Sequence, residues 1–140
     1  MRIVDFLIAD DIRFERGEKV SIIGVYNESI SVEGVLTLPF PLHIGFYIRI
    51  QLEDGEKPDG FSIDIRSNET PIAEVRGTIA YKEDETSGNV VIAIPANIFP
   101  VKESGKFEVT LRVLQGQDEF YCEKRSVPII IEHDPDAIST

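Results

Sequence analysis

The sequence has few of the residues that stabilise a secreted or membrane-embedded chain. Cys122 is its one cysteine, so no disulfide can form within the chain, which fits a reducing compartment. No apolar run approaches the roughly 18 residues that a membrane helix needs. The apolar segment 3–9 is interrupted by Asp5 and stopped by Asp10, and it is too short for a signal peptide. We therefore expect a soluble, cytoplasmic protein.

Basic residues are also scarce. The chain has 14 Lys and Arg against 25 Asp and Glu, a formal net charge of −11. Nucleic-acid binding draws most of its affinity from basic side chains on phosphates. An anionic membrane surface repels an acidic protein. We therefore expect neither a nucleic acid nor a membrane as partner.

Known catalytic and cofactor motifs are missing as well. The chain contains no Gly-x-Ser-x-Gly elbow and no phosphate-binding glycine loop. Its two histidines, His43 and His133, are far apart, and with one cysteine they are a weak basis for a zinc site. We predict no catalytic residues, no metal ligands and no cofactor.

In several segments of the sequence, apolar residues recur at every second position. In residues 46–53 apolar and polar side chains alternate, as expected of a strand with one buried face. The same alternation occurs in 61–66, 73–81 and 107–113. We expect the inward residues Ile48, Ile50, Val109 and Leu111 to lie in a core.

Less regular segments complete the strand pattern. They are 3–9, 19–26, 29–36, 89–94 and 119–131, with turns expected at Gly17 and at 115–118. One helical turn is predicted at 95–100, between two prolines. Pro128 places the last strand at a sheet edge or a bulge, because proline cannot donate to a central ladder.

These patterns predict the fold class. Short strands separated by turns indicate an all-β protein, a two-layer antiparallel β-sandwich of about seven to nine strands, immunoglobulin-like or C2-like in outline. We expect a single β-sandwich domain over residues 1–132 and a polar tail over 133–140.

Aspartates in turns and at a strand end are candidate binding residues: Asp10, Asp11, Asp54, Asp59 and Asp84. Calcium takes six to eight oxygens from acidic loops, but no EF-hand spacing is present, and turns recruit Asp for their own hydrogen bonds. Adjacent strand residues point to opposite faces, so Asp10 and Asp11 are not expected to converge.

The opening segment resembles a family of uncharacterised bacterial proteins. The resemblance rests on a hairpin formed by residues 6–13 and 17–26, on Phe40-Pro41 before a long strand, and on Gly105-Lys106-Phe107 at the start of a later one. It implies a fold but no assigned activity, so it carries over no catalytic residue.

Three functions follow as hypotheses. The leading one is a non-catalytic binding or assembly module that contacts a protein partner, or another copy of the chain, through a sheet edge or loops. The first alternative is a small-ligand or Ca²⁺-binding module using the acidic loops. The second is an enzyme with an unrecognised site, for which Asp10, Asp11 and His43 are the candidates.

Overall fold

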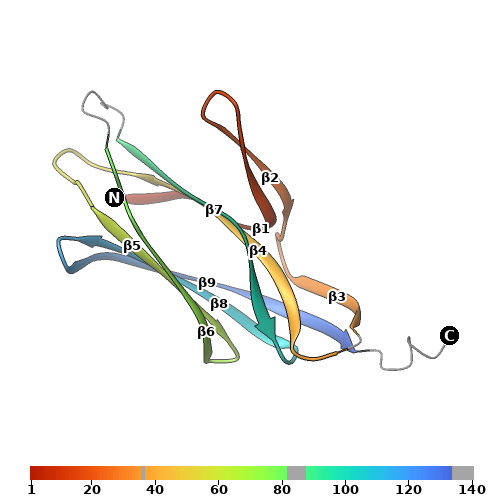
Figure 1. The fold of residues 1–140 in the computed structure, drawn as a ribbon. Helices are drawn as coiled ribbons and strands as arrows, with labels where there is room; N and C mark the ends of the chain where they lie inside the picture. The colour runs from red at the N-terminus through yellow and green to blue at the C-terminus, as the bar shows by residue number, and fades with distance from the viewer. Residues whose placement is uncertain (36, 82–87, 134–140) are drawn as a thin grey trace.

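The computed structural model describes residues 1–35, 37–81 and 88–133, and all regular structure in these residues is β (Figure 1). The predicted all-β class is confirmed, with nine strands in the described chain. They are β1 (Arg2–Glu15), β2 (Lys19–Val25), β3 (Ile30–Val35), β4 (Phe40–Gln51), β5 (Gly60–Ser67), β6 (Thr70–Thr78), β7 (Asn89–Val101), β8 (Gly105–Gln115) and β9 (Asp118–His133).

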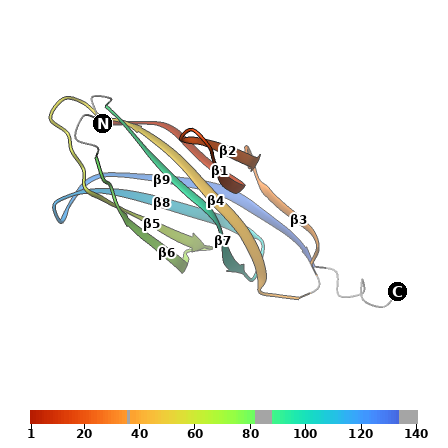
Figure 2. The same cartoon turned by 45° about the horizontal axis from the view of Figure 1, so that its top comes forward.

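The strands form two sheets that pack as a sandwich, as predicted (Figures 1 and 2). Sheet A has the order β2-β1-β4-β7, and sheet B has the order β3-β9-β8-β5-β6. The predicted turns at Gly17 and at 115–118 connect β1 to β2 and β8 to β9. Apart from His133, the predicted polar tail lies outside the described residues.

The sandwich is not wholly antiparallel, which corrects the prediction. β3 pairs with β9 in parallel, from Ile30 opposite Ile129 to Val35 opposite His133. The physical reason is a change of sheet. The chain leaves sheet A at the end of β2, passes through residues 26–29, and enters sheet B beside a strand that runs the same way.

The predicted helical turn at 95–100 is also wrong, because β7 continues as a strand through both prolines. β7 is an edge strand of sheet A. On its open side there is no neighbouring strand that would need the amide donor that proline lacks. Pro128 lies on β9, whose residues 118–128 pair only with β8, since β3 covers 129–133. β9 is not the edge strand of sheet B, since it lies between β3 and β8, but Pro128 falls in the part of it that has one paired neighbour.

The core lies between the sheets and is almost entirely apolar. Ile48, Ile50, Val109 and Leu111 are fully buried, as the alternation predicted. Phe99 of β7 lies between Phe46 of β4 and Phe107 of β8, with ring centroids 6.2 and 6.5 Å away. Tilted rings at this spacing attract one another beyond their area of contact, so this aromatic row joins the two sheets.

Truncating Leu111 should destabilise the fold strongly. Leu111→Ala leaves a cavity in a fully buried position, and we expect a loss of roughly 2–5 kcal/mol in the free energy of unfolding, measured by denaturant melts. The control is Ile130→Ala, an aliphatic residue that is 47% exposed, for which we expect a change within about 0.5 kcal/mol. Equal losses would contradict the inward assignment of Leu111.

Candidate functional site

The β1–β2 hairpin is the part of the fold that departs most from the sandwich. Residues 2–9 of β1 pair with β4, whereas residues 9–15 pair with β2. Between these halves β1 crosses β4. A Cβ atom built on Gly45 would lie 3.2 Å from the Ile12 nitrogen and 2.9 Å from the Ile94 oxygen. Only glycine lets the two backbones approach this closely.

The crossing takes place on the outer face of sheet A. Ile44 and Phe46, on either side of Gly45, point into the core, so Gly45 faces outward and Ile12 covers it from outside. Ile12 is itself buried by this contact. In Figure 1 the hairpin accordingly rises clear of the other strands at the top of the view.

Asp11 secures the crossing through a bulge in β7. Two β7 residues, Pro95 and Ala96, stand opposite the single residue Gly45 of β4, and a bulge leaves a backbone group without its ladder partner. The Ala96 amide instead donates to Asp11 Oδ1 at 2.9 Å, and the Ile12 amide donates to the same oxygen at 2.9 Å. Asp11 thus ties β1 to β7 across the intervening strand.

These contacts stabilise the ionised form of Asp11. The hydrogen bond from the Ala96 amide is the largest cause that lowers the pKa of Asp11, and the Ile12 amide and Arg13 act in the same direction. The Arg13 Nε atom lies 3.5 Å from Asp11 Oδ2. A carboxylate held by backbone donors in this way serves the backbone and is a weak general base.

Asp10 points elsewhere and holds the other end of the hairpin. Its Oδ1 accepts a hydrogen bond from the Tyr26 hydroxyl. Its carboxylate also occupies the space where a Cβ atom of Gly24 would lie, and Gly24 has a φ of +67°. Partial burial, followed by the Asp10 hydrogen bond, raises the pKa of Tyr26 to about 12. Asp10 and Asp11 therefore have separate partners.

The hairpin presents apolar side chains to solvent. Phe14 is 64% exposed, and Ile23 and Val25 of β2 are each more than one-third exposed. Phe14 lies opposite Val20, and Ile12 lies opposite Ile22. The side chains of these two pairs share one face of the hairpin. On this face only Ile12 is fully buried against the sandwich.

β2 is also an open sheet edge, and it differs from the other outermost strands of the two sheets, β7, β6 and β3. Edge strands are normally protected by charges, prolines, bulges or shortness. β7 has two prolines and a bulge, β6 has Pro71, Glu74 and Arg76, and β3 is six residues long and contains Glu33. β2 has Lys19 at its first position and no charge or proline in residues 20–25.

The remaining predicted binding residues lie apart from the hairpin. Asp54 and Asp59 belong to the loop between β4 and β5, and both are exposed. Asp59 Oδ2 accepts from the Gly116 amide at 3.2 Å, and the Asp59 backbone bonds to Leu114 and Ile79. Asp84 lies outside the described residues. The structure thus gives Asp59 a role in joining strand ends, and its partners are not those of Asp10 or Asp11.

The side chains considered for chemistry do not gather in the described chain. His43 and Cys122 are exposed on β4 and β9. No three His, Cys, Asp or Glu side chains in residues 1–35, 37–81 and 88–132 are placed to hold a metal ion. One groove of about 530 Å³ runs between β7 and residues 78–81, and neither Asp10, Asp11 nor His43 lines it.

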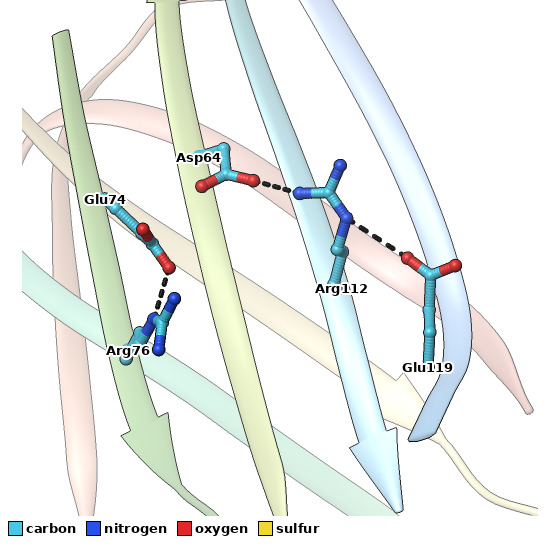
Figure 3. Close-up of polar contacts among 5 residues, drawn as sticks. All are labelled: Asp64, Glu74, Arg76, Arg112 and Glu119. Atoms are coloured by element: carbon cyan, nitrogen blue, oxygen red, sulfur yellow. Dashed lines mark hydrogen bonds and ion pairs between the residues drawn. The ribbon is translucent and has the colours of Figure 1, made fainter. Parts of the chain in front are cut away.

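The outer face of sheet B is a charged, internally paired surface. Arg112 of β8 bonds to Asp64 on one side and lies 3.1 Å from Glu119 on the other, while Arg76 pairs with Glu74 on β6 (Figure 3). Glu108 pairs with Lys106 and Lys124, at 2.7 and 3.5 Å. The Arg112 and Arg76 pairs are largely exposed and contribute about 0–1 kcal/mol each, whereas the Glu108 carboxylate is buried beneath its two exposed lysines.

Comparison with known proteins gives no assignment: no family model matches the sequence, and no curated protein matches it. The residues that the structure describes include no helix able to cross a membrane. The proposals below therefore depend on the geometry of the chain itself.

Sequence reasoning found the hairpin but not its role. It identified Asp10 and Asp11 as distinctive, yet the partner of Asp11 is a bulge 85 residues further along the chain. The signal for the edge was present in 20–25, a run of β-branched and small residues without charge. Gly45, a glycine inside an alternating strand, was the signal for a close backbone approach.

Removing the Asp11 carboxylate should free the Ala96 amide. We expect Asp11→Ala to abolish hydrogen-exchange protection of this amide in NMR spectra, whereas Asp11→Asn keeps an acceptor oxygen and retains most of it. Asp5→Ala, on the same strand, is the control and should leave the amide protected. Unchanged protection in Asp11→Ala would contradict the role given to this side chain.

Because the pKa of Tyr26 is raised, the free energy of unfolding should fall at strongly alkaline pH. Its pKa is raised from 10.0 to about 12, so the folded state holds the phenol proton more tightly than the unfolded state does. This stabilisation is complete below about pH 10 and is lost as the pH rises through about 12. Tyr26→Phe should remove both this dependence and the highest step in a phenolate absorbance titration. Tyr47→Phe should leave that step in place.

Proposed function

We propose that this protein is a non-catalytic binding module that docks a protein segment on the β1–β2 hairpin, by adding a strand to the free edge of β2. The observation that carries the proposal is the unprotected edge itself. β2 ends sheet A, and residues 20–25 carry no charge or proline. Strand addition of this kind takes its affinity from main-chain hydrogen bonds and its specificity from alternate side-chain contacts.

The position of the hairpin supports docking. Because the crossing at Gly45 lifts residues 10–15 of β1 away from β4, β2 stands off the sandwich (Figure 1). A partner strand can then reach its edge without displacing core residues. The exposed side chains of Ile23 and Val25 offer apolar contacts to that strand.

The hairpin is also fastened by side-chain hydrogen bonds at its base and at the end of β2, and such restraint lowers the entropy lost on binding. Asp11 fastens its base to β7, and the Tyr26–Asp10 hydrogen bond fastens the end of β2 to β1. The alternatives have less support among the described residues. Asp59 is already bonded to Gly116, and Asp10 and Asp11 bond to Tyr26 and to backbone amides.

Site-directed photo-crosslinking tests this proposal. A photoreactive residue replaces Ile23 on β2 or, as the control, Val91, which is 50% exposed on the opposite edge strand β7. We expect covalent adducts from position 23 in living cells and few from position 91. The chain identified in the adduct, once purified, should protect the amides of β2 from hydrogen exchange.

Two outcomes would refute the proposal. One is an equal yield of adducts from positions 23 and 91, because strand addition at β2 predicts a clear preference for position 23. The other is a purified adduct partner that binds but leaves the β2 amides exchanging freely, which would place the contact on another surface.

A further inference from the structure

We infer that the segment accepted by β2 is an extended stretch of another protein, with apolar residues opposite Val20 and Ile22 and an acidic residue opposite Lys19. The inference rests on the proposed function, because it names the chemistry of the partner at the same edge. It follows from the usable length of the edge, from the different charge on the two faces of the hairpin, and from the cations at the start of β2.

The usable edge of β2 covers residues 19–23. Gly24 has a φ of +67°, a conformation outside the extended region, so the regular ladder of a partner strand ends before it. Residues 19–23 contain no proline, and each therefore has an amide donor as well as a carbonyl acceptor. The docked segment is short, and its side chains alternate between the two faces of the hairpin.

One face of the hairpin is apolar across both strands. It carries Phe14 opposite Val20 and Ile12 opposite Ile22, and Phe14 is 64% exposed. A strand added beside β2 continues these two rows with its own residues opposite Val20 and Ile22. Apolar residues stabilise the pairing there, whereas a charged residue would lose solvation against the row without gaining a partner.

The other face carries the one charged residue of β2. Lys19 lies on this face opposite Glu15 of β1. Neighbouring strands are about 4.8 Å apart, so a partner residue opposite Lys19 lies one strand spacing from Lys19 and two, about 10 Å, from Glu15. Because physiological salt screens exposed charges beyond about 8 Å, Lys19 dominates this position. An acidic partner residue is favoured there and a basic one is disfavoured.

The surroundings of Lys19 favour a carboxylate as well. Neither Lys19 nor Arg16 forms an ion pair among the residues that the structure describes. An open hollow of about 530 Å³ at this end of the edge is lined by Glu15, Arg16, Lys19, Val20 and Ser21. It holds two cations against one carboxylate, and that carboxylate already accepts a hydrogen bond from the Ser21 hydroxyl at 3.2 Å. Glu18, in the turn before β2, does not line the hollow.

The direction of the partner strand sets the order of its residues. Antiparallel pairs are slightly more stable per residue than parallel ones, so we expect the docked segment to run against β2. From its amino end it then has a β-branched, an apolar, a polar, an apolar and an acidic residue, opposite Ile23, Ile22, Ser21, Val20 and Lys19. So short a contact is weak compared with a standard interface, and we expect a Kd on the order of 1 mM.

Peptide titrations followed by NMR test the chemistry of the partner. The probe is the acetylated and amidated peptide Gly-Thr-Val-Thr-Val-Glu-Gly, and its matched control has Lys in place of Glu. We expect the Glu peptide to shift the amide signals of residues 19–23 and to bind at least about fivefold more tightly than the Lys peptide, because its charged end meets Lys19. Added salt should narrow the difference.

Charge reversal on the protein assigns the contact to Lys19. In Lys19→Glu we expect the preference to invert, and in Lys19→Gln we expect it to disappear. Lys102→Glu is the matched control, because Lys102 is also exposed and forms no ion pair in the described part of the chain, but lies between β7 and β8. The preference should persist in this variant. A circular dichroism melt verifies that each variant is folded.

Each result decides the inference. A preference for the Glu peptide that is lost or inverted by the changes at Lys19, and kept in Lys102→Glu, supports it. Equal binding of the two peptides at residues 19–23 overturns it, as does the absence of any shift of these amides up to ~5 mM peptide. The proposed function is judged separately. If a protein captured at position 23 protects the β2 amides without such a segment, the inference fails and the proposed function stands.

Discussion

The close approach of two backbones at Gly45 is the constraint on which the rest of the structure depends. A side chain at this position would collide with Ile12 and with the Ile94 carbonyl, and β1 would have to stay beside β4 along its whole length. Because Gly45 has no side chain, β1 passes over β4 and reaches β7 instead. The bulge at Ala96 then needs a hydrogen-bond acceptor, which Asp11 supplies.

The crossing determines which backbone groups the sandwich leaves open. Had residues 10–15 of β1 continued along β4, β2 would have lain in the plane of sheet A as an ordinary edge strand. Instead β2 pairs with a segment that has already left the sheet. The same crossing that satisfies the bulge in β7 therefore sets β2 off the sandwich, which is the position that the proposed function requires.

Much of the fold could be predicted from the sequence, because alternation reports directly on burial. Leu111 follows Thr110 and precedes Arg112, and the sheet buries it accordingly. The prediction failed where non-local contacts override local pattern. Residues 10–15 are mostly charged, yet they are strand because β2 pairs with them, and Pro95 lies in a strand because β7 is an edge. The role of Asp11 could not be predicted, since its partner lies on a bulge that only the assembled sheet creates.

The charge distribution links the composition of the chain to its proposed function. Acidic residues outnumber basic ones by 25 to 14, which repels copies of the chain from one another at long range. Residues 20–25 of β2 are free of charge, and the charges on the outer face of sheet B are paired with one another. A negatively charged surface with one neutral strand edge disfavours non-specific association of the chain with itself. Under the proposed function, the lack of a protective charge on β2 is what leaves this edge open to a partner strand.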